Sequence, residues 1–81
     1  MTRDEILTLV RTHLAEELEV DAAKIDEGTR FKEDLDADSL DLYELVMELE
    51  DRYGISVSEE QAARIGTVGE AVEFVVEHAR V

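Results

Sequence analysis

The sequence contains no cysteine, no proline and no tryptophan, and it is poor in basic residues. Without cysteine the chain has no disulfide framework, no thiolate metal site and no cysteine nucleophile. No stretch approaches the ~20 apolar residues that span a bilayer. Met1–Glu5 also lacks the basic start and the apolar run of a secretory signal. We therefore expect a soluble, cytoplasmic protein.

The scarcity of basic residues leaves a large negative charge. Eight Lys and Arg oppose 22 Asp and Glu, which gives a formal net charge of −14 at pH 7. This charge repels the phosphates of nucleic acids and anionic lipid surfaces, so we expect neither as a partner and instead expect proteins with basic patches. Residues 33–60 contain 11 acids and one base, a net charge of −10. Such a segment is either a solvated helix face that maintains solubility or a recognition surface.

The remaining composition is that of one small folded domain. The chain has 81 residues, of which 44% are hydrophobic, too many for a disordered acidic tail. This length allows a single domain over residues 1–81. A chain this short buries a modest fraction of its surface, so it has little room for a deep catalytic cleft.

Three helices are indicated by capping boxes and apolar spacing. Residues 6–18 place an apolar side chain at every third or fourth position, after the box Thr2-Arg3-Asp4-Glu5. A similar pattern follows Thr67-Val68-Gly69-Glu70, and Ser58-Glu59-Glu60-Gln61 opens a short helix that ends near Gly66. The residues expected to face the core are Ile6, Leu7, Val10, Leu14 and Leu18, then Ala62, Ala63 and Ile65, and finally Val68, Ala71, Val72, Val75, Val76 and Ala79.

The middle helix carries two apolar rows where a small domain needs one. It should begin at Asp38 or Ser39 and end at Tyr53-Gly54, because glycine takes the left-handed conformation that closes a helix. The core row is Leu42, Leu45, Val46, Leu49 and Tyr53, and the second row is Leu40, Tyr43 and Met47. The second row either widens the core face or forms a half-exposed strip on which a partner docks. The acids that rim it are Asp41, Glu44, Glu48, Glu50 and Asp51.

Residues 19–37 form a connection that is long for two neighbouring helices. Alternating strand-like residues are missing, so we predict no sheet. Ile25, Phe31 and Leu35 are spaced to attach the loop to the core, and Gly28 should allow it to turn. The predicted fold is all-α, an up-and-down bundle of three main helices plus one short helix, with a long loop between the first two main helices.

Asp34, Asp36 and Asp38 have the spacing of the first ligands of an EF-hand calcium loop. Position 6 of that loop would be Ser39 instead of glycine, and position 12 would be Leu45 instead of a bidentate glutamate. We therefore reject an EF-hand and predict no dedicated metal site, although so many carboxylates should bind divalent cations loosely.

Catalytic motifs are missing from the sequence. His13 and His78 are far apart, without a metal-binding pattern around either, and we expect both at the surface or its boundary. Neither G-x-S-x-G nor S-x-x-K occurs. Acids on exposed helices lack the cavity that perturbs the pKa of catalytic carboxylates. We expect that the protein catalyses nothing by itself.

Ser39 stands where the long loop meets the middle helix. A serine at a helix start often serves only as a cap. Here, however, a hydroxyl in the first turn points away from the core, and the free N–H groups and dipole of the helix favour an attached phosphate. Asp38 and Asp41 on either side could orient an incoming enzyme through its Arg and Lys side chains. These considerations permit a phosphate-linked group at Ser39 without identifying it.

Residues 36–50, Asp-Ala-Asp-Ser-Leu-Asp-Leu-Tyr-Glu-Leu-Val-Met-Glu-Leu-Glu, resemble the signature of acyl carrier proteins of dissociated (type II) fatty acid synthesis. Residues 31–35, Phe-Lys-Glu-Asp-Leu, resemble the family's approach to that site, and residues 65–68, Ile-Gly-Thr-Val, resemble its entry to the last helix. The resemblance covers nearly the whole chain. Fifteen residues in register are specific, whereas Asp-Ser-Leu alone is a weak match.

The resemblance implies a carrier of growing acyl chains in fatty acid biosynthesis. The chains would be thioesters on a 4′-phosphopantetheine arm, which a phosphopantetheinyl transferase attaches to Ser39 from coenzyme A. The protein would be a monomeric, non-catalytic subunit that serves fatty acid synthase enzymes with basic patches. Its partner-binding residues would be Asp38, Leu40, Asp41, Tyr43, Glu44, Met47, Glu48 and Glu50, and the acyl chain would be sheltered by Val46, Leu49 and Ile65.

Three features depart from the family's usual pattern. Tyr43 replaces a smaller residue, Leu42 replaces a residue that is often small or polar, and no proline precedes the short helix. These changes leave the attachment site intact and affect only the assignment to a pathway. Two alternatives therefore stay open, a discrete carrier of polyketide or other specialised acylation, and an acidic protein-interaction module without a prosthetic group.

Overall fold

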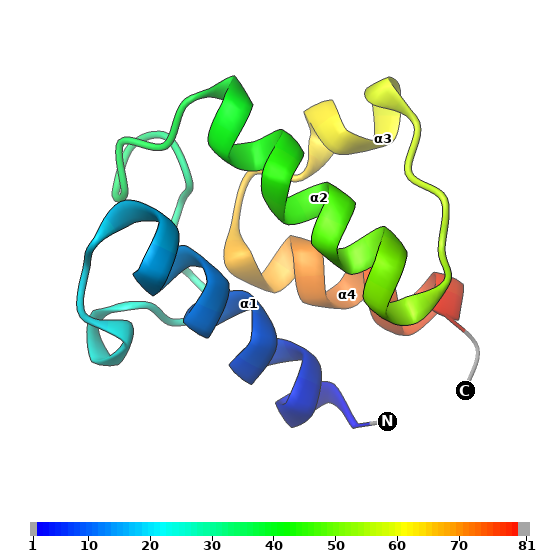
Figure 1. The fold of residues 1–81 in the computed structure, drawn as a ribbon, viewed down its shortest axis with the longest axis horizontal. Coiled ribbons are helices and arrows are strands. Elements are labelled where there is room, and N and C mark those ends of the chain that lie inside the picture. Colours follow the sequence, from blue (N-terminus) through cyan, green and yellow to red (C-terminus); the bar gives the residue numbers. More distant parts are fainter. Residues whose placement is uncertain (1, 80–81) are drawn as a thin grey trace.

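The computed structural model describes residues 2–79, which form an all-helical bundle (Figure 1). The elements are α1 (Arg3–Leu18), the 3₁₀ helix η1 (Ala22–Lys24), α2 (Ser39–Tyr53), α3 (Glu59–Arg64) and α4 (Val68–Ala79). Helices α1, α2 and α4 pack on one another, and the short α3 packs against α2. The predicted bundle of three main helices, one short helix and a long loop is confirmed.

Each α-helix begins where a side chain accepts a hydrogen bond from the first turn, which satisfies an N–H group that has no partner inside the helix. The capping pairs are Thr2 with Glu5, Asp38 with Asp41, Ser58 with Gln61, and Thr67 with Glu70. At the other end, α2 closes at Gly54, which has a left-handed φ of 65° as predicted. Helix α1 closes at Glu19, whose left-handed φ of 55° is unusual for a residue with a side chain.

The core lies between α1, α2 and α4 and takes three side chains from the long loop, Ile25, Phe31 and Ala37. Its fully buried large members are Phe31, Ile6, Leu14, Ile25, Leu45, Val10, Val68, Val72 and Val75. Burying such a side chain contributes about 1.5–3 kcal/mol. Two predicted core residues are exposed. Val76 is 44% exposed and Ala63 is exposed. Each is one position past an inward-facing residue, so it points about 100° away around its helix.

The long loop is attached to the beginning of α4 through its backbone. The Gly69 N–H donates to Glu27 O at 2.8 Å, and the Val68 N–H donates to Thr29 O at 3.0 Å. Both N–H groups lie in the first turn of α4, where no intrahelical acceptor is available. The loop therefore supplies the acceptors that the first turn of α4 lacks. Ile25 and Phe31, each 1% exposed, attach the loop to the core as predicted.

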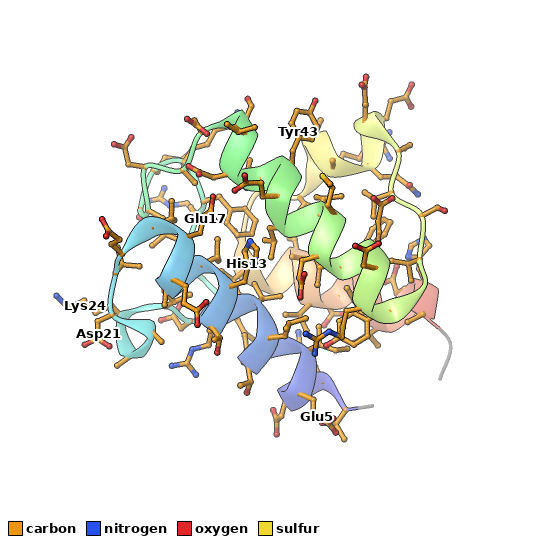
Figure 2. All side chains as sticks on the ribbon, viewed as in Figure 1. Glu5, His13, Glu17, Asp21, Lys24 and Tyr43 are labelled. Atoms are coloured by element: carbon orange, nitrogen blue, oxygen red, sulfur yellow. The ribbon has the colours of Figure 1, made fainter. Side chains whose placement is uncertain are left out.

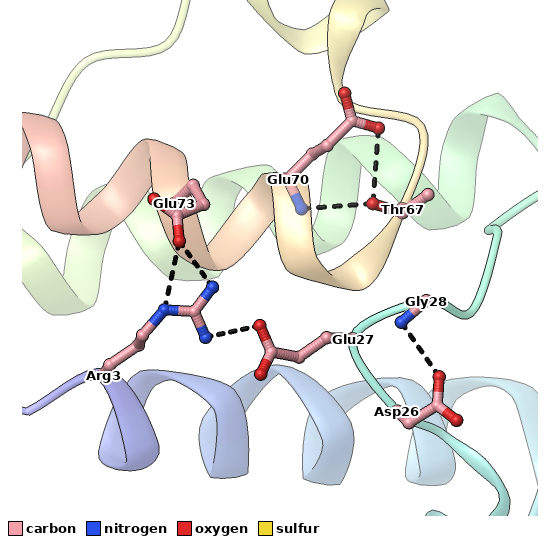
Figure 3. A network of polar contacts seen from close by, with 7 residues as sticks. All are labelled: Arg3, Asp26, Glu27, Gly28, Thr67, Glu70 and Glu73. Atoms are coloured by element: carbon pink, nitrogen blue, oxygen red, sulfur yellow. Dashed lines mark hydrogen bonds and ion pairs between the residues drawn. The ribbon is translucent and has the colours of Figure 1, made fainter.

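The loop turns at Glu27 and Gly28, as predicted, although the backbone of Gly28 is not left-handed. The Asp26 carboxylate stabilises this turn by accepting hydrogen bonds from the Gly28 N–H and the Thr29 hydroxyl. Close to this turn, Arg3 of α1 connects three elements by pairing with Glu27 of the loop and Glu73 of α4 (Figure 3).

None of the helices within residues 2–79 has the length and hydrophobicity of a membrane-spanning segment.

Candidate functional site

Ser39 is the first residue of α2 and is exposed to solvent. No side chain or backbone group of residues 2–79 forms a hydrogen bond with its hydroxyl. The sequence has two other serines, Ser56 and Ser58, and the Ser58 hydroxyl is occupied in the cap of α3. Ser39 therefore presents a free hydroxyl at the positive end of a fifteen-residue helix.

The backbone around Ser39 is fixed on both sides. Asp38 caps α2 by accepting from the Asp41 N–H at 3.0 Å, and the Asp41 carboxylate accepts from the Asp38 N–H at 3.1 Å. Before the helix, Asp36 has a left-handed φ of 54°, and Ala37 is buried with its N–H bonded to Phe31 O at 2.9 Å. This arrangement orients the Ser39 hydroxyl outward without any interaction of its own.

A cavity of about 260 Å³ opens beside Ser39, between α2, α3 and the end of the long loop. Its lining residues are Phe31, Lys32, Glu33, Ser39, Leu42, Tyr43, Glu59, Ala62, Ala63, Ile65 and Gly66. Of the three residues predicted to shelter an acyl chain, Ile65 lines this cavity. Val46 is half-buried and outside the lining, and Leu49 is 2% exposed within the core. The cavity lies at the N-terminal end of α2, whereas Val46 and Leu49 lie farther along the helix.

The second apolar row of α2 is exposed. Leu40 is 65%, Tyr43 49% and Met47 60% exposed, so these side chains do not widen the core face. We call this row the docking strip (Leu40, Tyr43 and Met47). It begins directly after Ser39. Three large apolar side chains exposed to solvent on one helix are typical of an interaction surface.

Most of the acids predicted to bind partners already form hydrogen bonds or ion pairs within the fold. Asp38 and Asp41 cap the helix, Glu48 pairs with Arg52 at 3.3 Å, and Glu50 accepts a hydrogen bond from the Val57 N–H at 2.9 Å. Glu44 is exposed and has no basic partner within 4 Å among the described residues. Glu50 therefore also has a structural role, since it holds the connection between α2 and α3.

Sequence reasoning did not identify the approach of Glu17 to the acids of α2. Carboxylate oxygens of Glu17, Asp41 and Glu44 lie within 4.8 Å of one another, close enough for one divalent cation to contact all three. A hydrogen bond with Glu44, partial removal from water and the negative charges of Glu44 and Asp41 raise the pKa of Glu17 to about 7. Glu17 and Glu44 are 27 positions apart in the sequence, so no local pattern could indicate this contact.

The two histidines lie where the sequence placed them. His13 on α1 is half-buried (Figure 2), and its Nε2 atom has no hydrogen-bond partner within residues 2–79. His78 is exposed and stacks on Phe74, with ring centroids 4.0 Å apart. Neither histidine lines the cavity beside Ser39.

Comparison with known proteins agrees with this geometry. Residues 8–75 match the family described as "Phosphopantetheine attachment site". The chain is 49% identical to an acyl carrier protein of Rubrobacter xylanophilus, over 96% of both chains. It is 41% identical to an acyl carrier protein of Lactobacillus acidophilus, over 96% of this chain and 98% of that one.

A solved structure supports the same assignment at the level of the fold. The acyl carrier protein from Enterococcus faecalis superposes with a TM-score of 0.82 and 39% sequence identity, covering 95% of this chain and 98% of that chain. The family match spans most of the chain, and the curated relatives match over nearly their full length. The chain therefore belongs to the acyl carrier protein family of phosphopantetheine-attachment domains.

Proposed function

We propose that Ser39 is the attachment point of 4′-phosphopantetheine in this acyl carrier protein. The observation that carries this proposal is the exposed, unpartnered Ser39 hydroxyl at the start of α2, beside a cavity of about 260 Å³. When bound, the group supplies a thiol that holds an acyl chain as a thioester, and the protein is a carrier rather than a catalyst. We place its work in fatty acid synthesis, in the cytoplasm, as a single monomeric domain over residues 1–81.

The surroundings of Ser39 suit the group in two ways. Ser39 and Leu40 occupy the first turn of α2, where backbone N–H groups and the helix dipole favour a phosphate. Ser39 itself is part of the lining, so an arm attached there would have the cavity beside it. Phe31, Leu42 and Ile65 give this cavity apolar walls suited to an acyl chain. A longer chain would extend along α2 toward Val46 and Leu49.

An intact-mass measurement tests the attachment. The chain is incubated with coenzyme A and a broad-specificity phosphopantetheinyl transferase, and its mass should increase by one phosphopantetheine group. Ser39→Ala should abolish the gain and leave the helical circular dichroism unchanged, because the Ser39 hydroxyl makes no hydrogen bond within residues 2–79. If the wild-type chain gained no mass, the carrier function would be excluded for it. Loss of helicity in Ser39→Ala would mean that Ser39 is a structural residue.

An acyl carrier protein interacts with synthase enzymes, and we propose that those enzymes and the transferase dock on the docking strip and the acids around it. Charge complementarity supports basic patches on these partners, since residues 33–60 carry a net charge of −10. Five acids, Asp38, Asp41, Glu44, Glu48 and Glu50, lie at the N-cap of α2 or within the helix that carries the docking strip. Apolar contact would then provide affinity, and the acids would orient the partner and accelerate its association.

The docking surface is tested by reversing one charge inside it and one outside it. Glu44→Lys should weaken binding to the transferase or to a ketoacyl synthase more than Glu77→Lys does. Both positions are exposed and both variants change the net charge equally, but Glu77 lies on α4. Equal effects in a titration at fixed salt would show that net charge alone controls association.

A further inference from the structure

Tyr43 belongs both to the docking strip and to the lining of the cavity beside Ser39. Leu40 and Met47, the other members of the strip, do not line the cavity. Tyr43 stands four residues after Ser39 on α2, so the two side chains share one face of the helix. Figure 2 shows Tyr43 projecting from α2 beside α3. One side of its ring therefore bounds the cavity, and the other, with 49% of the residue exposed, faces solvent.

Among the apolar residues that line the cavity, Tyr43 is the large side chain with the most freedom to move. On the side of α3 the lining consists of Glu59, Ala62 and Ala63, followed by Ile65 and Gly66 after the helix. Phe31 is bulky but only 1% exposed, and it is held in the core. Leu42 and Ile65 pack against the core, and the exposed Lys32, Glu33 and Glu59 are charged. Tyr43 is therefore the large apolar side chain of the lining that is exposed enough to move without disturbing the core.

We propose that Tyr43 is a specificity-determining residue, whose ring forms the outer wall of the cavity and determines how much of an attached acyl chain is shielded from water. This inference rests on the proposed function at Ser39. Because the same ring is exposed on the docking strip, an enzyme that docks there contacts the wall behind which the chain lies.

The size of the cavity gives the proposal a chain length. A methylene group takes up about the volume of a water molecule, ~30 Å³, so about 260 Å³ corresponds to roughly eight or nine chain carbons. Acyl chains up to about octanoyl should therefore fit behind Tyr43. Additional methylenes would have to leave past the ring or enter the core.

The experiment measures the melting temperature of the full chain carrying the arm alone, or the arm with an acetyl, hexanoyl, octanoyl or dodecanoyl group. Intact mass confirms each load first, so failure of attachment is recognised separately from failure of the role of Tyr43. A chain that packs into the folded protein raises its melting temperature. In the wild type the rise should grow from acetyl to octanoyl and then level off. Tyr43→Ala should lose most of the octanoyl-induced rise.

Two variants serve as controls. Tyr43→Phe retains the ring and should retain the rise. Met47→Ala removes a side chain of the same strip that lies outside the cavity, and it should also retain the rise. A second readout is the rate at which hydroxylamine cleaves the octanoyl thioester to the hydroxamate and the free thiol, which should increase in Tyr43→Ala only.

Three results would overturn the proposal. The first is an octanoyl-induced rise in Tyr43→Ala as large as in the wild type. The second is the absence of any rise in a correctly loaded wild-type chain. The third is an equal loss of the octanoyl-induced rise in one of the two controls. Loss in Met47→Ala would assign the effect to the docking strip as a whole, and loss in Tyr43→Phe would assign it to the tyrosine hydroxyl.

Discussion

At the scale of single residues, Glu17 has the most perturbed acidic environment in the described part of the chain. It projects from the last turn of α1 toward Asp41 and Glu44 of α2, and its pKa is raised to about 7 mainly by the hydrogen bond with Glu44. The last turn of α1 contains no basic residue that could offset this charge. Proton uptake by Glu17 therefore relieves repulsion between α1 and the helix that carries Ser39.

The stability of the chain should consequently depend on the protonation of Glu17. The unfolded chain releases this proton near the ordinary pKa of 4.5, whereas the folded chain keeps it up to about pH 7. The folded state thus binds more protons between these values, and the free energy of unfolding falls as the pH rises through that range. Glu17→Gln should flatten the decrease and should melt at a higher temperature than the wild type at about pH 8.

The matched control is Glu16→Gln, which removes the same charge from the neighbouring exposed position on α1. Thermal melts of the three proteins between about pH 5 and pH 8 provide the comparison. If Glu16→Gln flattened the profile as much as Glu17→Gln, general repulsion among acids would explain the pH dependence, and the cluster with Asp41 and Glu44 would not.

At the scale of elements, the junction between the long loop and α4 requires a glycine at one position. A Cβ atom on Gly69 would lie 2.9 Å from Glu27 O and 3.3 Å from Glu27 Cβ. Because the Gly69 N–H donates to that same oxygen, Gly69→Ala must displace the loop and weaken the bond. We expect a loss of about 1–3 kcal/mol in the free energy of unfolding.

Gly28→Ala is the corresponding control in the same loop. A Cβ there would meet its nearest neighbour, Asp26 Oδ1, at an ordinary 3.5 Å, and the backbone is not left-handed. Urea denaturation should show no loss, or a gain of about 0.4–1 kcal/mol from the reduced entropy of the unfolded chain. Equal losses for the two variants would contradict the close approach at Gly69.

Local signals made the helices predictable, and non-local contacts explain what the sequence did not reveal. Capping boxes and apolar spacing act within a few residues, so the positions of the four α-helices and the second apolar row of α2 could be predicted. Whether that row is exposed could not be decided from the sequence. The importance of Gly69 could not, because it depends on Glu27, 42 positions away. Ala63 and Val76 were misplaced because the neighbouring helices determine which flank of an apolar face is covered.

At the scale of the whole molecule, most of the negative charge is uncompensated. Within the described residues, ion pairs involve three arginines, Arg3, Arg30 and Arg52, and five of the acids. The chain has 22 acids in all. Like charges held in a compact fold repel one another, which lowers stability at low ionic strength.

Added salt should therefore stabilise this protein. Raising sodium chloride from about 10 mM to about 0.5 M shortens the screening length severalfold and should raise the melting temperature. Millimolar magnesium should raise it further than sodium chloride of equal ionic strength, because carboxylates of two helices lie together at Glu17, Asp41 and Glu44. A melting temperature that does not respond to either salt would show that the acids are already compensated.

The functional site was predictable to the extent that α2 alone forms it. The position of Ser39, the second apolar row of Leu40, Tyr43 and Met47, and the neighbouring acids all follow from the register of one helix, whereas the exposure of that row is a finding of the structure. The cavity could not be predicted in the same way, because α3 and the long loop supply much of its lining. Ile65 lines this cavity and Leu49 lies in the core, and their part in sheltering an acyl chain stays a prediction.

Fragmentation of the modified chain in the mass spectrometer identifies which serine carries the prosthetic group, and we expect Ser39. The wild-type protein is treated with coenzyme A and transferase, and the intact ion is fragmented in the mass spectrometer. The mass increment should appear on every fragment that contains Ser39 and on no other. An increment on fragments that contain Ser56 or Ser58 without Ser39, or no increment at all, would contradict the account.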